Sequence, residues 1–165
     1  MLRWEVTSAD QLLSEEEVRR HLKLLPDDTD NLSDLIQAAR EYCENYTGES
    51  YGSETVEVDV DAAQIVELPR TPATGITSIT ANGETVTDYT FNAGFGIVTF
   101  GTELGNVHIV YTAGKTLPQT VKQAMLSLIG HWHTNREAVV VGAIATVEPS
   151  IGAKELLRQY KGWWF

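Results

Sequence analysis

The chain has 165 residues, of which 12 are basic and 23 acidic, so its formal net charge at pH 7 is −11. Apolar residues make up 42% of it, a share that supports a folded core and excludes an intrinsically disordered chain. The longest apolar stretch covers residues 138–145, far short of the roughly 20 residues that a membrane-spanning helix needs. The first residues lack the apolar run of a secretion signal, and the single cysteine, Cys43, suits a reducing cytoplasm. We expect one soluble domain over residues 1–165 that contacts no membrane.

The negative charge is concentrated in the first half of the chain. Residues 1–70 hold 17 acidic and 6 basic side chains, whereas residues 71–165 hold 6 of each. Such a surface repels phosphate groups, so we expect no tight binding of nucleic acid. Two interpretations follow: a solvated face that keeps the protein soluble, or a wall along which DNA passes without binding.

Two helices are expected near the start of the chain. Ser14 and Glu17 have the spacing of a capping box, in which the serine hydroxyl accepts a hydrogen bond from the backbone amide of the glutamate. Apolar side chains then recur at helical spacing, which predicts a helix over residues 14–25 that a proline ends. The same periodicity predicts a longer helix over residues 28–47, followed by the glycine of a C-terminal stop.

The middle of the chain changes to a period of two. Between residues 55 and 112 the pattern predicts about six short strands, with Asn82-Gly83 as a tight hairpin turn. A helix over residues 118–136, an arm over 138–152 and a terminal helix over 153–160 are expected to follow. The predicted fold class is α+β: a mainly helical core of about four helices with a β-rich insert of short antiparallel strands, a flexible C-terminal arm and a terminal helix.

No catalytic constellation stands out in the sequence. His133 and Glu137, four residues apart on a helix, would supply half of a metal site, but no second pair has a suitable spacing. Neither the Gly-x-Ser-x-Gly elbow of a hydrolase nor the Gly-Lys-Ser/Thr of a phosphate-binding loop occurs. We expect no enzyme activity, no cofactor and no bound metal.

Two apolar segments near the carboxyl end stand where polar residues are normally found. Ala138–Ile151 carries one charge, Glu148, and the chain closes with Trp163-Trp164-Phe165. Either both segments fold back onto the domain's own core, or they meet another subunit, since exposed apolar patches usually mark interfaces.

Several segments, taken in order, resemble the head–tail connector (adaptor, head-completion) family of long-tailed bacteriophages and related gene-transfer particles. They are Glu67-Leu68-Pro69-Arg70-Thr71-Pro72, Val107–Gly114, Leu117–Ala124 and His131–Gly142, together with the acidic helical start and the helix that ends at Tyr46-Thr47-Gly48. The order of the segments matches over nearly the whole chain.

This resemblance implies a structural protein of the virion without catalytic residues. It implies a ring of subunits, commonly twelve, that docks beneath the portal of the DNA-filled head and prepares it for the stopper or tail. The expected partners are other copies of the chain, the portal protein and a stopper or tail-completion protein, while DNA passes through the channel without specific binding. The expected location is the head–tail interface of the virion, and the host cytoplasm during assembly.

The resemblance and the apolar segments together predict where these contacts lie. The arm that contacts the neighbouring subunit would include Arg136–Gly142. The expected subunit or portal interface consists of Arg136, Glu137, Val139, Val140, Val141, Ile144, Trp163, Trp164 and Phe165. Glu54, Glu57, Asp59 and Asp61 are expected to line the channel. The alternatives are another virion completion protein, such as a stopper, and a small metal-dependent hydrolase that uses His133 and Glu137.

Overall fold

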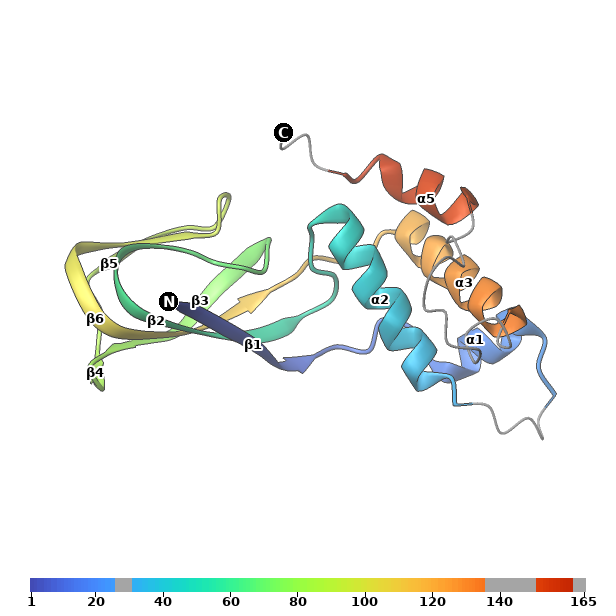
Figure 1. Cartoon of the computed structure of the whole chain (residues 1–165), viewed down its shortest axis with the longest axis horizontal. Helices are drawn as coiled ribbons and strands as arrows, with labels where there is room; N and C mark the ends of the chain where they lie inside the picture. Colours follow the sequence, from blue (N-terminus) through green and yellow to red (C-terminus); the bar gives the residue numbers. More distant parts are fainter. Residues whose placement is uncertain (26–30, 136–150, 162–165) are drawn as a thin grey trace. The chain divides into compact units, whose positions relative to one another are not determined.

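The computed structural model describes residues 1–25, 31–135 and 151–161, and its elements form two compact units (Figure 1). The sheet unit is made of Met1–Asp10 and Glu49–Thr116, and the helical unit of Gln11–Gly48 and Leu117–Phe165. The elements of the sheet unit are β1 (Leu2–Ala9), β2 (Glu54–Glu67), β3 (Ala73–Ala81), β4 (Glu84–Thr85), β5 (Tyr89–Asn92) and β6 (Ile97–Ala113). Those of the helical unit are α1 (Glu15–Leu22), α2 (Ser33–Thr47), α3 (Gln119–Thr134) and α5 (Ile151–Arg158).

The predicted fold class is wrong in its emphasis. About 40% of the structure is strand, and the six strands form one antiparallel sheet, so the protein is mainly a sheet accompanied by helices and not a helical core with an insert. The prediction failed because it treated the strands as short. β2 has 14 residues and β6 has 17, so both are longer than the short strands that the period-two pattern predicts.

The sheet has the strand order β1-β2-β6-β3-β4, and β5 pairs with β6 beside this path. β2 and β6 pair along most of their lengths, and between Ala63 and Ile65 the register shifts because β6 bulges there, with residues 100–103 opposite the single residue 64 of β2. Bulges bend strands and increase their twist, which lets the two long strands take part in both halves of a curved sheet. The enclosed core consists of Val56, Val58, Val66, Leu68, Ala73, Ile79, Ala81, Val98, Phe100, Val107, Ile109, Tyr111 and Ala113.

The hairpin between β3 and β4 turns at Asn82-Gly83, as predicted. Asn82 has a φ of 52° and Gly83 a φ of 84°. Two successive positive φ values are typical of the tight turn whose twist matches that of the flanking strands.

Three connections leave the sheet unit close to one another, and their backbones are hydrogen-bonded together. The Asp10 amide donates to the Ser53 carbonyl, the Gly52 amide to the Lys115 carbonyl and the Lys115 amide to the Ser50 carbonyl. Gly114 is required here, because it has a φ of 108° and a Cβ at this position would overlap the Gly52 carbonyl. We call these bonded segments, residues 10, 50–53 and 114–115, the exit cluster.

The helical unit begins with the predicted cap. The Ser14 hydroxyl accepts from the Glu17 amide at 3.2 Å, and Gly48, with a φ of 73°, ends α2. The buried apolar side chains of this unit are Leu13, Val18, Leu32, Ile36, Ala39, Cys43, Val121, Ala124, Met125, Leu126, Leu128, Ile129, Ala153 and Leu157. None of the helices described has both the length and the apolar character needed to cross a membrane.

Candidate functional site

The predicted subunit or portal interface falls on residues that the structure does not describe. Arg136, Glu137, Val139, Val140, Val141 and Ile144 lie in 136–150, and Trp163, Trp164 and Phe165 lie in 162–165. Their assignment stays a prediction. The same holds for the pairing of His133 with Glu137. Within the described ranges, no group of three His, Cys, Asp or Glu side chains is placed to hold a metal ion.

The four carboxylates predicted to line a channel occupy different surroundings on β2. Asp59 and Asp61 are exposed, with 67% and 70% of their side chains accessible, and Glu57 is half-buried at 34%. Glu54 is a correction to the set, because its side chain is only 1% exposed and lies against Arg70. A carboxylate buried in this way contributes no charge to a surface along which DNA would pass. The channel role of the other three remains a prediction.

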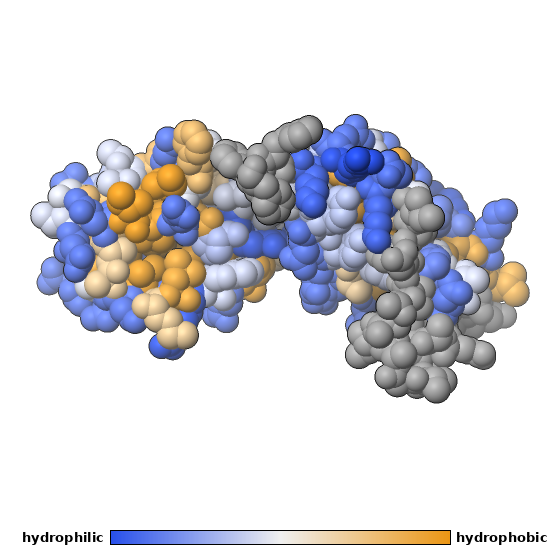
Figure 2. Space-filling model, turned by 45° about the horizontal axis from the view of Figure 1, so that its top comes forward, coloured by the Kyte–Doolittle hydropathy of each residue, from blue (hydrophilic) through white to orange (hydrophobic). Residues whose placement is uncertain are grey.

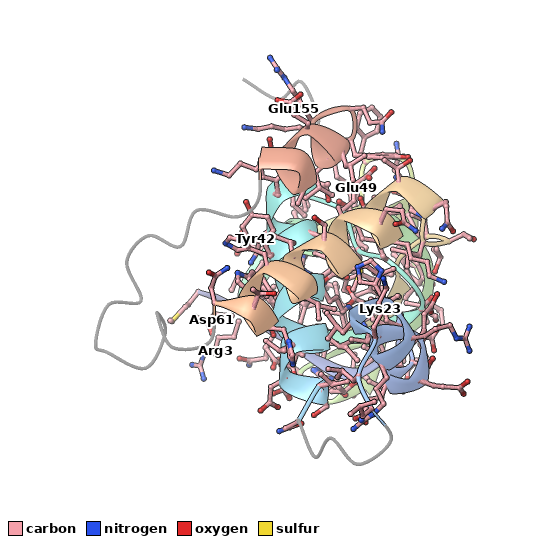
Figure 3. All side chains as sticks on the ribbon, turned by 90° about the vertical axis from the view of Figure 1, so that its right-hand side faces the viewer. Arg3, Lys23, Tyr42, Glu49, Asp61 and Glu155 are labelled. Atoms are coloured by element: carbon pink, nitrogen blue, oxygen red, sulfur yellow. The ribbon has the colours of Figure 1, made fainter. Side chains whose placement is uncertain are left out.

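The exposed carboxylates of β2 make an ordered polar face with the neighbouring strands. The Asp59 carboxylate lies 2.8 Å from Nδ1 of His108 on β6, and Glu57 lies 3.9 Å from Nε2 of the same ring. Asp61 accepts a hydrogen bond from the amino group of Met1, which lowers the pKa of Asp61, and the positive charge of Arg3 adds a smaller effect (Figure 3). This face combines fixed charges with one histidine.

Glu54 instead forms a buried ion pair that ties β2 to the turn before β3. Nε and Nη2 of Arg70 donate to the two carboxylate oxygens at 2.8 and 3.2 Å. The Arg70 amide donates to the hydroxyl of Tyr111, which donates in turn to the Arg70 carbonyl. Burial raises the pKa of Tyr111 to about 12. Since every one of these groups bonds within the sheet, the cluster supports the fold.

Cys43 is also structural. Its side chain is fully buried, and burial raises the pKa of the thiol to about 12, with a smaller effect from the neighbouring Glu44. A nucleophilic cysteine needs a lowered pKa and access to solvent, and Cys43 has neither. Nearby, Tyr42 stacks on Tyr46 and meets the ring of Trp132 edge-on, with 6.3 Å between centroids in both pairs. These aromatic contacts pack α2 against α3.

Apolar side chains at the surface are concentrated on the sheet unit. Figure 2 shows them, in orange, gathered over part of one face of this unit. The large apolar side chains with more than a third of their surface exposed are Met1, Leu2, Trp4, Val6, Ile65 and Phe95 in the sheet unit and Leu25 in the helical unit. Because unburied apolar area of this kind usually marks a contact with another molecule, the surface suits an assembly protein.

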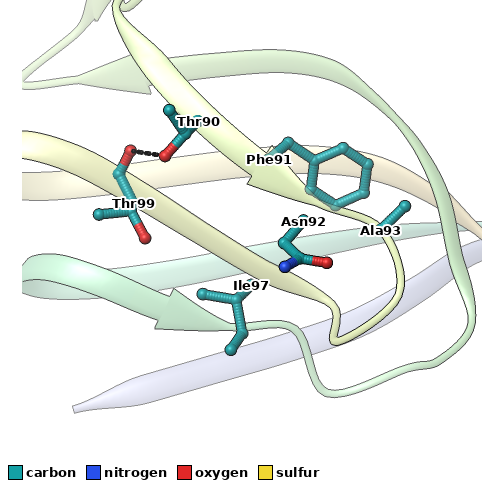
Figure 4. Close-up of a pocket in the computed structure, with 6 residues that line it drawn as sticks. All are labelled: Thr90, Phe91, Asn92, Ala93, Ile97 and Thr99. Atoms are coloured by element: carbon teal, nitrogen blue, oxygen red, sulfur yellow. Dashed lines mark hydrogen bonds between the residues drawn. The ribbon is translucent and has the colours of Figure 1, made fainter.

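A pocket lies on the hairpin formed by β5 and β6 (Figure 4). It has a volume of about 490 Å³ and is lined by Thr90, Phe91, Asn92, Ala93, Ile97 and Thr99, which we call the hairpin pocket. The Thr90 hydroxyl donates to the Thr99 carbonyl across the two strands at 3.5 Å. No titratable group lines this pocket, so it offers apolar and neutral polar contacts and no acid–base chemistry.

Comparison with known proteins agrees with an assembly role. A family described as "Head completion protein" matches residues 11–145 of this chain. No curated protein matches it.

Among solved structures, the chain is similar to a chain in the neck of a native GTA particle computed with C12 symmetry. The two are 22% identical, with a TM-score of 0.70 over 98% of this chain and 94% of that one. It is also similar to a chain in the neck of an empty GTA particle computed with C6 symmetry, at 21% identity and a TM-score of 0.69 over 98% and 95% of the two chains. A third match is to the virion of a native gene transfer agent particle, at 21% identity and a TM-score of 0.67 over 98% and 95%.

These likenesses cover nearly the whole fold, and the family match spans both units. The resemblance inferred from the ordered sequence segments is thereby confirmed. The chain belongs to the head completion protein family.

Proposed function

We propose that this head completion protein forms a ring at the neck of a virus or gene-transfer particle, beneath the portal, and offers the docking surface for a stopper or tail. The observation that carries this proposal is the family match over residues 11–145, joined to a shared fold over 98% of the chain with a component of a particle neck. A structural role in connecting head and tail is the role of the family as a whole.

The ring is supported by the symmetry of the similar structures. Two of them were computed with C6 and C12 symmetry, in which copies are related by rotation about a common axis. A cyclic assembly of more than two copies requires each subunit to use two different surfaces. We propose twelve copies for this chain, with the portal on one side and a stopper or tail-completion protein on the other.

The charge of the sheet unit supports a channel that does not retain DNA. This unit has 11 acidic and 3 basic residues, a net charge of −8, against −3 for the helical unit. Phosphate groups are repelled by such a surface, so DNA would slide past it without forming stable contacts. We propose that Glu57, Asp59 and Asp61 face this channel.

The residues proposed to contact other subunits are those of the apolar arm and the aromatic end. We place Arg136, Glu137, Val139, Val140, Val141 and Ile144 in the contact between neighbouring subunits, and Trp163, Trp164 and Phe165 against the portal. In this proposal the chain has no enzyme activity, residues 1–165 act as one connector domain, and assembly takes place in the host cytoplasm.

The test is electron microscopy and native mass spectrometry of the purified protein, alone and mixed with its portal. We expect closed rings, at least in the presence of the portal. Val140→Asp should reduce ring formation strongly, because a carboxylate would have to be buried in the contact. Thr77→Asp, which adds the same charge at an exposed position of β3, is the matched control.

Two outcomes would contradict the proposal. Wild-type protein that stays monomeric with and without portal would remove the ring. Rings of Val140→Asp as stable as those of Thr77→Asp would remove the arm from the interface.

Deletion of Trp163–Phe165 should weaken portal binding without changing the circular dichroism spectrum. Unfolding of that variant would instead show that the aromatic end packs on its own chain.

A further inference from the structure

Apolar side chains form rows that run across the strands of the sheet, and the last member of each row, on β1, is exposed to solvent. The pairing registers align one residue from each of β3, β6, β2 and β1 in three rows. The rows are Ile76–Tyr111–Val56–Val6, Ile79–Ile109–Val58–Trp4 and Ala81–Val107–Val60–Leu2. Directly paired residues of neighbouring strands project from the same face of a sheet, so each row is continuous across four strands.

Burial along these rows stops at the last strand. Val56 and Val58 on β2 are fully buried, whereas their partners on β1, Val6 and Trp4, are 39% and 47% exposed. Leu2 is 43% exposed. The core of the sheet unit is therefore covered over β3, β6 and β2 and open over β1. We call Leu2, Trp4 and Val6 the open row.

β1 is also the edge of the sheet. It pairs with β2 on one side, and no strand within the described ranges pairs with its other side. Edge strands are normally protected from pairing by charges, prolines or bulges. β1 has a bulge only between Val6 and Ser8, and its charges, Arg3 and Glu5, alternate with the open row and so project from the opposite face. The core face of this edge is apolar, and the charges of β1 lie on the opposite face.

We infer that a neighbouring copy of this chain covers the open row when the ring forms. This inference rests on the proposed ring. Rotational symmetry requires a contact between two different surfaces, and the open row supplies one of them. The hairpin pocket supplies the other, because β5 pairs with the side of β6 that faces away from β2 and β1. There Ile97 of β6 lies beside the neutral polar side chains of Thr90, Asn92 and Thr99. Trp4, the largest side chain of the open row, is the anchor of this contact, as aromatic residues are in protein interfaces.

The net charge of the sheet unit limits which side chains can stabilise such a contact. A net charge of −8 on this unit makes two copies repel each other at long range. The contact must then be made by uncharged side chains, and the open row and the hairpin pocket both consist of uncharged residues. Salt screens the repulsion and leaves apolar contacts intact, so ring formation should become stronger as ionic strength rises.

The first experiment compares Trp4→Glu with Thr7→Glu in the full-length protein. Both add one carboxylate to β1, but only position 4 belongs to the open row. We expect at least a tenfold higher concentration for half-maximal ring formation in Trp4→Glu, with a melting temperature of the monomer no more than about 4 °C below that of the wild type. Thr7→Glu should assemble like the wild type. Equal assembly of the two variants would overturn the inference and would leave the proposed ring standing.

A second experiment detects the contact by disulfide cross-linking and leaves Trp4 in place. Leu2→Cys and Thr90→Cys in one chain place thiols on the open row and in the hairpin pocket, while the native Cys43 is buried. Oxidised rings should run as covalent oligomers on a denaturing gel, and each single variant should run as monomer and dimer only. Rings of normal size that yield no oligomers beyond those of the single variants would overturn the assigned contact. Absence of rings from the wild type would overturn the proposed function and this inference together.

Discussion

The sheet unit carries a net charge of −8 and six of the seven large exposed apolar side chains in the described structure, whereas the helical unit carries −3 and one. The helical unit encloses its apolar residues at the contacts of α1, α2, α3 and α5. The sheet unit leaves one side of its core open at β1. The comparison indicates that, of the residues described, those of the sheet unit contribute most of the surface for assembly, and that those of the helical unit are closed by their own packing.

The largest effect on stability is expected at the buried ion pair of the sheet unit. Glu54→Ala leaves the Arg70 guanidinium in a buried place without its bidentate partner, which should lower the free energy of unfolding by about 4 kcal/mol. Denaturant unfolding followed by circular dichroism measures this loss. Glu57→Ala, two residues along the same strand and half-exposed, is the control and should change stability by less than about 0.5 kcal/mol. Equal losses would show that the pair is no more important than a surface charge.

The contrast between covered and open positions can be tested within a single row. Ile109→Ala removes a fully buried side chain and should cost about 3 kcal/mol. Trp4→Ala, at the open end of the same row, should cost the monomer about 1 kcal/mol or less, because nearly half of the Trp4 side chain is already in water. Unfolding of both variants at concentrations where the protein is monomeric tests this. A loss at Trp4 as large as that at Ile109 would mean that the row is closed in the monomer.

A smaller effect is expected at the start of α1 in the helical unit. Ser14→Ala removes the side-chain acceptor of the Glu17 amide and should cost about 1 kcal/mol. Ser14→Asp restores an acceptor and should recover most of the loss. If both substitutions were equally destabilising in thermal unfolding, the hydrogen bond of the cap would not be the cause.

The two units should begin to lose stability at different alkaline pH values. Burial raises the pKa of Cys43 and of Tyr111 to about 12, above the ordinary values of their unfolded forms. The folded protein therefore holds each proton more tightly, and the stability linked to it is complete at low pH and lost as pH rises. The loss should begin near pH 9 for Cys43 in the helical unit and near pH 10 for Tyr111 in the sheet unit. Cys43→Ala should abolish the earlier phase, and an unchanged profile in that variant would contradict the assignment.

The elements with local signals were the ones that sequence could predict. Asn82-Gly83 and the Ser14 cap depend on neighbouring residues, and both occur as expected. β1 is not among the predicted elements, although Leu2, Trp4 and Val6 alternate with polar residues at the start of the chain. The period-two pattern of that stretch would have predicted the strand.

Long-range pairing could not be predicted from sequence. β1 meets β2 across about 50 residues of chain, and nothing local specifies that partner. Glu54 looked like one more exposed carboxylate of an acidic strand, and only its pairing with Arg70 shows that it is buried. The length of β6 was hidden by Gly101 and Gly105, which interrupt the apolar pattern in the middle of one continuous strand.

The exit cluster has a mechanical consequence. Each of the three connections that leave the sheet unit is hydrogen-bonded to another through residues 10, 50–53 and 114–115. Residues 50–53 are bonded both to residue 10 and to residue 115, so a pull on any one connection is passed to the others through this segment. The close approach of Gly114 to Gly52 keeps these backbones near enough to share that tension.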